Sequence, residues 1–130
     1  MMGGRFLLDT NIIIAIFAYD RSVLEALKAA NEVFVASIVL GELFYGAYKS
    51  AHADTNIFKI EEFASVCPVL NCDIGTSREY GKIKNALRIK GQPIPENDIW
   101  IAALAFQHNL TLVSRDQHFK KIDGLRMEAW

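Results

Sequence analysis

The chain has 130 residues, of which 52% are hydrophobic and 22% charged, and its formal net charge is −1. This length fits a single domain spanning residues 1–130, and the hydrophobic content argues against disorder. A near-neutral charge excludes nucleic-acid binding through overall basicity, although local patches can still bind. No apolar run approaches the roughly 20 residues of a membrane helix. The N-terminus lacks a signal-peptide pattern, so we expect a cytoplasmic protein that does not enter membranes.

Short apolar segments alternate with longer helical ones, which predicts an α/β protein with a mostly parallel sheet. The expected strands cover residues 5–8, 32–36, 69–70, 111–113 and 126–128. The first expected helix covers residues 10–18, and the last covers 96–108, followed by one turn at 117–121. The four between them are expected after Asp20 or Ser22 to residue 30, after Ser37 to 50, from Asp54 or Thr55 to 65, and after Asp73 or Thr76 to 90. Asp20 or Ser22, Ser37, Asp54 or Thr55, and Asp73 or Thr76 are the candidate N-caps, and Gly91 the candidate left-handed stop.

Two kinds of residue are assigned structural roles. Cys67 and Cys72 flank the third expected strand without zinc-like spacing, so we expect reduced thiols, although the sequence alone also permits a disulfide. Trp100 and Trp130 are expected to be packing residues.

Four acidic residues stand where burial is expected: Asp9, Glu42, Asp98 and Asp116. Asp9 and Asp116 each follow an apolar strand candidate. Asp98 opens the longest apolar helical pattern, and Glu42 lies within another apolar helix. Each acid alone has an ordinary explanation, such as a cap or a turn, but isolated buried carboxylates are costly unless they are paired or bind a metal. Together the four acids predict one cation site.

The expected topology brings these acids together. Ligands of open parallel sheets bind beyond the carboxyl ends of the strands, where Asp9 and Asp116 are expected. Glu42 shares a helical face with Ile38 and Val39, so its side chain should point inward. Asp98 lies in a first helical turn, where the helix dipole also favours a carboxylate.

These motifs, taken in their order, resemble the PIN-domain family, and more narrowly the VapC-type toxin ribonucleases of type II toxin–antitoxin pairs. The resemblance is carried by LLDTN at 7–11, GEL at 41–43, NDIWIAA at 97–103 and LVSRD at 112–116, and it extends to 81–87, 90–94 and 118–122. Each motif alone is weak, but their combined order and spacing are specific, and they cover nearly the whole chain.

The resemblance implies a three-layer α/β/α sandwich and a metal-dependent endoribonuclease that leaves 5′-phosphate and 3′-hydroxyl ends. It implies that Asp9, Glu42, Asp98 and Asp116 bind Mg²⁺ or Mn²⁺ and are the catalytic acids. By position, Thr10 and Ser114 support the metal ligands, and Asn11 helps to orient the pocket. Some relatives carry a further acid where this chain has His118. The resemblance also implies a cognate antitoxin that masks the pocket, and a homodimer.

Several readings stay open at this point. Arg115 could contact an RNA phosphate or neutralise the acidic pocket. Lys82 and Arg88 could follow an RNA backbone, although basic residues on a long helix more often form a solvated face. A haloacid-dehalogenase-type enzyme is set aside because Asn11 replaces the second aspartate of that motif. A catalytically silent PIN-like module that docks RNA or protein is the remaining alternative.

The segment 12–17 is apolar on every side of its expected helix, and Phe44, Tyr45 and Tyr48 add aromatic surface nearby in sequence. A domain of this size cannot easily bury every face of such a helix. We therefore expect part of this surface to contact a second copy or the antitoxin.

Overall fold

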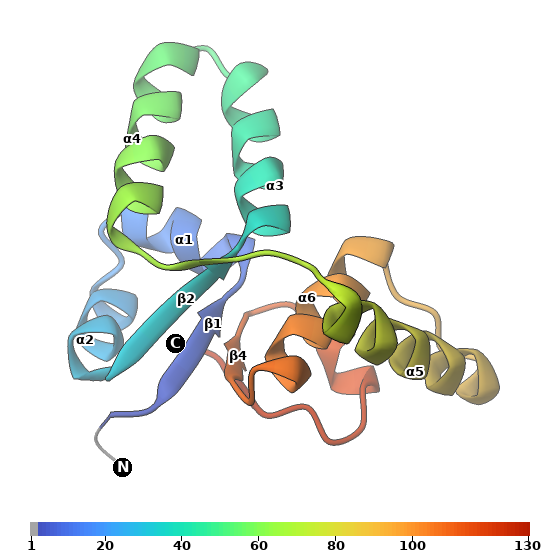
Figure 1. The fold of residues 1–130 in the computed structure, drawn as a ribbon. Helices are drawn as coiled ribbons and strands as arrows, with labels where there is room; N and C mark the ends of the chain where they lie inside the picture. Colours follow the sequence, from blue (N-terminus) through green and yellow to red (C-terminus); the bar gives the residue numbers. More distant parts are fainter. Residues whose placement is uncertain (1–2) are drawn as a thin grey trace.

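The computed structural model describes residues 3–130 and is built around a five-stranded sheet with the order β3-β2-β1-β4-β5 (Figure 1). Every neighbouring pair of strands is parallel. The strands are β1 (Arg5–Leu8), β2 (Glu32–Ala36), β3 (Val69–Leu70), β4 (Thr111–Val113) and β5 (Met127–Glu128). The expected mostly parallel sheet is confirmed, and the sheet is parallel throughout.

Within residues 3–130, six α-helices and one short 3₁₀ helix connect the strands. They are α1 (Thr10–Phe17), α2 (Arg21–Ala29), α3 (Ser37–Tyr48), α4 (Ala53–Val66), α5 (Ile74–Lys90), α6 (Glu96–Gln107) and η1 (Gln117–Lys121). Asp20 caps α2, and Asp73 caps α5 in a capping box with Thr76, as expected. Gly91 ends α5 with φ of 68°, the left-handed conformation predicted for it.

Two predicted helix starts are wrong by one or two residues. Ser37 is the first residue of α3 rather than its cap, because β2 runs into α3 without a loop and the extended residue Ala36 takes the cap position. Helix α4 starts at Ala53, after His52, so neither Asp54 nor Thr55 is its cap. Asp54 instead lies in the first turn, where a carboxylate also interacts favourably with the helix dipole.

The strand order explains how the helices enclose the sheet. From β1 the chain moves outward through β2 to β3, and it then returns to the other side of β1 to form β4 and β5. Right-handed crossovers that run in opposite directions place their helices on opposite faces. Figure 1 shows α3 and α4 extending beyond the ends of β1 and β2. Helices α5 and α6 lie together near β4, away from α3 and α4. The predicted three-layer α/β/α arrangement is confirmed.

The central strands form the core. Leu7 and Leu8 of β1 and Leu112 and Val113 of β4 are fully buried, as expected for strands covered on both faces. Trp130 packs edge-on against Phe6 with ring centroids 5.0 Å apart. Trp100 stacks on Tyr80 at 4.1 Å. Both tryptophans are therefore packing residues, as predicted.

The apolar helix α1 is buried on one side only. Ile12 and Ile13 are fully buried, whereas Ile14 is 54% exposed. Tyr45 and Tyr48 of α3 are also exposed. The prediction that this region cannot bury all its apolar surface within one copy of the chain is confirmed.

Cys67 and Cys72 are free thiols, as predicted, and burial raises the pKa of Cys67 to about 11.

Among residues 3–130, no helix is both long and apolar enough to cross a membrane.

Candidate metal centre

The candidate site lies where the strand order reverses. β2 and β4 are the two neighbours of β1. The chain leaves β1 toward β2 on one side, and it later forms β4 on the other side of β1. Such a switch point opens a crevice at the carboxyl ends of the two strands. Asp9 directly follows β1, and Ser114 directly follows β4. The backbone N–H of Asp9 donates to the carbonyl of Val113 at 2.9 Å, which fixes the two strand ends to each other.

Asp9 is a buried carboxylate held by three donors. Its side chain is the N-cap of α1, with Oδ1 accepting from the N–H of Thr10 at 2.8 Å. Its Oδ2 accepts from the Ser114 hydroxyl at 2.7 Å and, more weakly, from the Asn11 amide at 3.4 Å. The residue is only 5% exposed. These donors fix the direction of both carboxylate oxygens.

Ser114 and Asn11 connect the strand ends to the loop that carries Asp116. The Ser114 hydroxyl accepts from the backbone N–H of Asp116 at 3.0 Å. The side-chain oxygen of Asn11 accepts from the backbone N–H of Arg115 at 3.1 Å. Both residues therefore make direct hydrogen bonds at the predicted site, and their supporting role there stays a prediction.

Glu42 reaches the site from α3. Its Oε1 accepts from the Thr10 hydroxyl at 3.0 Å, and Thr10 is the residue after Asp9. Glu42 is half-buried, with Val39 fully buried on one side of it and Tyr45 67% exposed on the other. Glu42 therefore points inward, as expected. It lies at the edge of the buried face of α3, beside Thr10.

Asp98 and Asp116 meet at a shared neighbour. Asp98 lies in the first turn of α6, and its side chain is 13% exposed. Asp116 caps η1 by accepting from the N–H of His118 at 2.9 Å. The Nδ1 of His118 lies 3.3 Å from Asp98 Oδ2 and 3.1 Å from Asp116 Oδ1.

The carboxylates repel one another across the site. Burial is the main cause that raises the pKa of Asp9, and the charge of Asp116 raises it further, against the hydrogen bonds from Ser114 and Thr10. The pKa of Asp98 is raised to about 6. Burial is the main cause, and the charges of Asp9 and Asp116 also raise it. This mutual effect places Asp9, Asp98 and Asp116 within one electrostatic environment.

The donor set fits a hard divalent cation. Asp9, Asp98 and Asp116 are partly or fully buried acids without a basic side chain of lysine or arginine bonded to them in residues 3–130. A divalent ion favours carboxylate oxygens and would neutralise their repulsion. These three carboxylates, with Glu42 beside them, are the residues that could hold Mg²⁺ or Mn²⁺.

Arg115 points away from the acids. Its guanidinium lies 3.0 Å from Asp20 Oδ2 and also donates to the backbone carbonyl of Trp130 at 2.8 Å. Hydrogen bonds from Ser22 and Arg115 lower the pKa of Asp20 to about 2. Arg115 thus ties the loop after β4 to the start of α2, a contact with a distant residue that local sequence patterns do not reveal.

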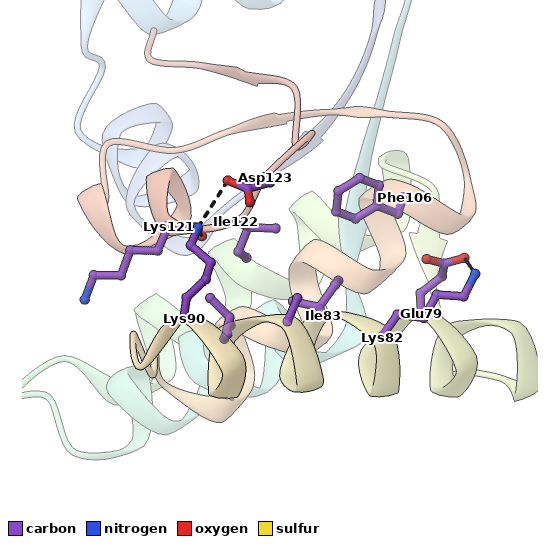
Figure 2. Close-up of a pocket in the computed structure, with 10 residues that line it drawn as sticks. Glu79, Lys82, Ile83, Lys90, Phe106, Lys121, Ile122 and Asp123 are labelled. Carbon is purple, nitrogen blue, oxygen red and sulfur yellow. Dashed lines mark hydrogen bonds and ion pairs between the residues drawn. The ribbon is translucent and has the colours of Figure 1, made fainter.

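Lys82 and Arg88 lie on α5, away from the four acids. Lys82 pairs with Glu79 at 3.6 Å, and Arg88 donates to Asn85 at 2.9 Å. Lys82 lines a cavity of about 200 Å³ between α5 and the segment after η1, in which Ile83 and Phe106 supply apolar surface (Figure 2). None of the four acids lines this cavity.

His118 is the residue at the site that the sequence interpretation did not assign. Its position in the sequence matches a place where some relatives carry an acid, but the contact with Asp98 depends on how η1 packs against α6. The sequence separation of 20 residues gives no helical or strand periodicity from which that contact could be predicted.

Comparisons with known proteins show the family of this chain. The family model described as "PIN domain" matches residues 6–125. Ribonuclease VapC2 of Haemophilus influenzae is 39% identical, over 97% of this chain and 98% of the relative. The tRNA(fMet)-specific endonuclease VapC of Shigella flexneri is 35% identical, over 97% of this chain and 98% of the relative.

Solved structures give the same result. DNA-bound VapBC of Salmonella typhimurium matches with a TM-score of 0.89 and 33% identity, covering 100% of this chain and 99% of that one. VapBC2 of Rickettsia felis, bound to a promoter DNA fragment, matches with a TM-score of 0.88 and 33% identity, over 97% and 98% of the two chains. The chain therefore belongs to the PIN-domain family, among its VapC-type ribonucleases.

Proposed function

We propose that this protein is a divalent-metal-dependent endoribonuclease and the toxin of a type II toxin–antitoxin pair. The observation that carries the proposal is the chain of contacts among three acids at the switch point: Ser114 bonds to Asp9 and to the backbone of Asp116, and His118 lies against Asp116 and Asp98. Glu42 bonds to Thr10, the residue after Asp9. The names of the similar proteins, ribonuclease and endonuclease, support RNA as the substrate. We further propose that residues 1–130 act as one domain.

The chain's own residues would bind the ion and fix the reacting geometry. We assign Asp9, Asp98 and Asp116 as the main ligands and Glu42 as the ligand or base beside them. When bound, Mg²⁺ or Mn²⁺ lowers the pKa of a coordinated water and screens the charge that develops on the phosphate.

Hydrogen bonds prepare the ligands for this task. The Ser114 hydroxyl and the Thr10 N–H aim the two oxygens of Asp9, while the Thr10 hydroxyl holds Glu42. Carboxylates fixed before the ion arrives need little reorganisation when charge develops in the transition state. The burial of Asp9 keeps water from competing for its oxygens.

We also propose an antitoxin and a second copy of the chain as partners. Similar solved structures are named as VapBC complexes, which supports an antitoxin. An open groove of about 360 Å³ is lined by Thr10 and Glu42, and Ile14 and Phe17 supply apolar surface to it. A partner segment lying in this groove would cover the approach to Glu42.

The first test is cleavage of total cellular RNA by the purified chain with Mg²⁺, with Mn²⁺ and with EDTA. We expect discrete fragments that carry 5′-phosphates, lost in EDTA and in Asp9→Asn. Asp54→Asn, a matched first-turn acid of α4 outside the site, should retain activity. A protein that binds either metal but cuts no RNA would support the silent docking module instead.

The toxin role has its own test, which is growth of a bacterial host after induction of the chain alone. Wild type should arrest growth, whereas Asp9→Asn at an equal protein level should not. Equal growth of the two cultures, from a protein that cleaves RNA when purified, would reject the toxin role and leave the nuclease assignment intact.

A further inference from the structure

His118 occupies an unusual place beside the acids. It belongs to η1, directly after the turn that carries Asp116, and its side chain is 46% exposed. Its Nδ1 faces carboxylate oxygens from two separate elements, Asp98 of α6 and Asp116 of the loop after β4. One imidazole nitrogen therefore joins the two carboxylates on the open side of the site.

Three candidate ligand atoms converge here. One atom each from Asp98, Asp116 and His118 lies within 4.8 Å of the other two. The separations from Nδ1 are 3.1 and 3.3 Å. Neighbouring ligands around an octahedral ion with bonds of about 2.1 Å lie about 3 Å apart, so these separations suit ligands of one ion.

The backbone holds His118 in this position. Its N–H donates to the Oδ1 of Asp116 at 2.9 Å, and Phe119, the next residue, is fully buried. The main chain at residue 118 is thus fixed from both sides. The imidazole is half-exposed, and its 3.3 Å contact with Asp98 is long for a hydrogen bond, so folding does not require a histidine at this position.

We propose that Nδ1 of His118 is an additional ligand of the divalent ion, and that this nitrogen shifts the site toward first-row transition metals such as Mn²⁺ and Co²⁺ at the expense of Mg²⁺. The inference rests on the proposed metal-dependent function. It deepens that proposal by adding a ligand and a metal preference specific to this chain.

The chemical basis is the difference between oxygen and nitrogen ligands. Mg²⁺ keeps oxygen ligands and loses its waters reluctantly. Imidazole favours later transition metals, and their affinity for a mixed nitrogen and oxygen site rises from Mn²⁺ to Co²⁺. A site made of Asp9, Asp98 and Asp116 alone would lack this preference. Within residues 3–130, His118 supplies the imidazole nitrogen that lies against two of those carboxylates.

The test is metal binding by the full chain, measured by calorimetry with Mn²⁺ and with Mg²⁺. In His118→Asp, which supplies oxygens only, the ratio of the Mg²⁺ to the Mn²⁺ dissociation constant should fall at least about tenfold, in line with losses of single metal-site residues. His118→Asn tests the loss of the imidazole without an added charge. His52→Asn, an exposed histidine before α4, is the matched control and should leave the ratio unchanged.

A spectroscopic measurement tests direct coordination. Pulsed electron paramagnetic resonance of the Mn²⁺-loaded chain should detect coupling to a nitrogen-14 nucleus, and this coupling should disappear in both His118 variants but persist in His52→Asn. Bound Mn²⁺ with no nitrogen coupling, or with an unchanged Mg²⁺ to Mn²⁺ ratio in His118→Asp, would overturn the inference. Failure of wild type to bind either metal would instead reject the proposed metal centre as a whole.

Discussion

The two halves of the candidate metal centre are built differently. Asp9, Ser114 and Asp116 stand at the ends of the central strands, where each bonds to another and to backbone fixed by the sheet. Glu42 and Asp98 arrive on helices, and each contacts the site through one polar side chain, Thr10 for Glu42 and His118 for Asp98. The strand-borne half is rigid by construction, whereas the helix-borne half depends on how α3 and α6 pack.

This contrast indicates a division of labour. Side chains locked by packing and by supporting hydrogen bonds hold a reacting geometry best. We therefore assign the fixed position of the ion to the strand-borne half, and adjustment to metal and substrate to the helix-borne half. Substitutions in the first half should reduce activity most, and those in the second half less.

Asp9→Asn should have the largest effect, because it removes a charge from the most firmly held ligand. We expect RNA cleavage to fall at least about 10³-fold. The thermal unfolding temperature should stay equal or rise, because a buried carboxylate with a raised pKa is replaced by a neutral amide. A lower unfolding temperature with proportional loss of activity would mean that Asp9 serves folding rather than catalysis.

Glu42→Gln should reduce cleavage by about 10- to 100-fold, the range found for groups that support a metal site. The amide can still accept the hydrogen bond from Thr10, so the fold should be unaffected. Steady-state cleavage of a defined RNA fragment would measure the change, with the exposed Glu61→Gln of α4 as control. If Glu42→Gln reduces cleavage as much as Asp9→Asn does, the proposed difference between the strand-borne and helix-borne halves is wrong.

Ser114→Ala should reduce cleavage by roughly tenfold and lower the free energy of unfolding by about 1–3 kcal/mol. The substitution removes the hydroxyl that donates to Asp9 and accepts from the N–H of Asp116. Chemical denaturation and RNA cleavage should both respond. Ser114→Thr, which retains the hydroxyl, should keep more activity than the alanine variant if the hydrogen bonds are responsible.

Asp98→Asn should change how stability depends on pH in the metal-free chain. The pKa of Asp98 is raised from 3.8 to about 6, so between these values the folded state binds more protons than the unfolded state. Its contribution to stability is therefore full below pH 3.8 and is lost as the pH rises through 6. The unfolding free energy of Asp98→Asn minus that of wild type should increase across this window and then level off.

Saturating Mn²⁺ provides the check on that explanation. Metal that binds the folded wild type selectively stabilises it by mass action, so it should reduce the advantage of Asp98→Asn above pH 6. An advantage that is flat with pH would contradict the raised pKa of Asp98. An advantage that the metal does not alter would show that Asp98 does not bind the ion.

The sequence predicted the fold and the four acids because both depend on local patterns. Each strand is a short apolar run, and an acid that interrupts or ends an apolar run is conspicuous without any knowledge of tertiary contacts. The parallel order then places Asp9 and Asp116 at the same edge of the sheet, as the topology rule requires. The roles of these residues in metal binding remain a proposal.

The features that the sequence did not predict depend on packing between distant segments. Arg115 was considered for phosphate binding or neutralisation of the pocket, but its partner is Asp20, 95 residues away. His118 was seen only as a missing acid, because its contact with Asp98 arises when η1 lies against α6. Local propensity also placed the start of α3 one residue late, since a strand that runs directly into a helix leaves no separate capping residue.

The pairing of β4 beside β1 has a consequence for the timing of activity during synthesis. Ser114 follows Asp9 by 105 residues, so Ser114 and Asp116 emerge from the ribosome well after Asp9. Until β4 has left the ribosome, β1 lacks its neighbour on that side, and the acidic edge lacks Asp116. The acidic edge is therefore complete only after β4 has formed beside β1, and a partner that binds the earlier segments can meet the chain before then.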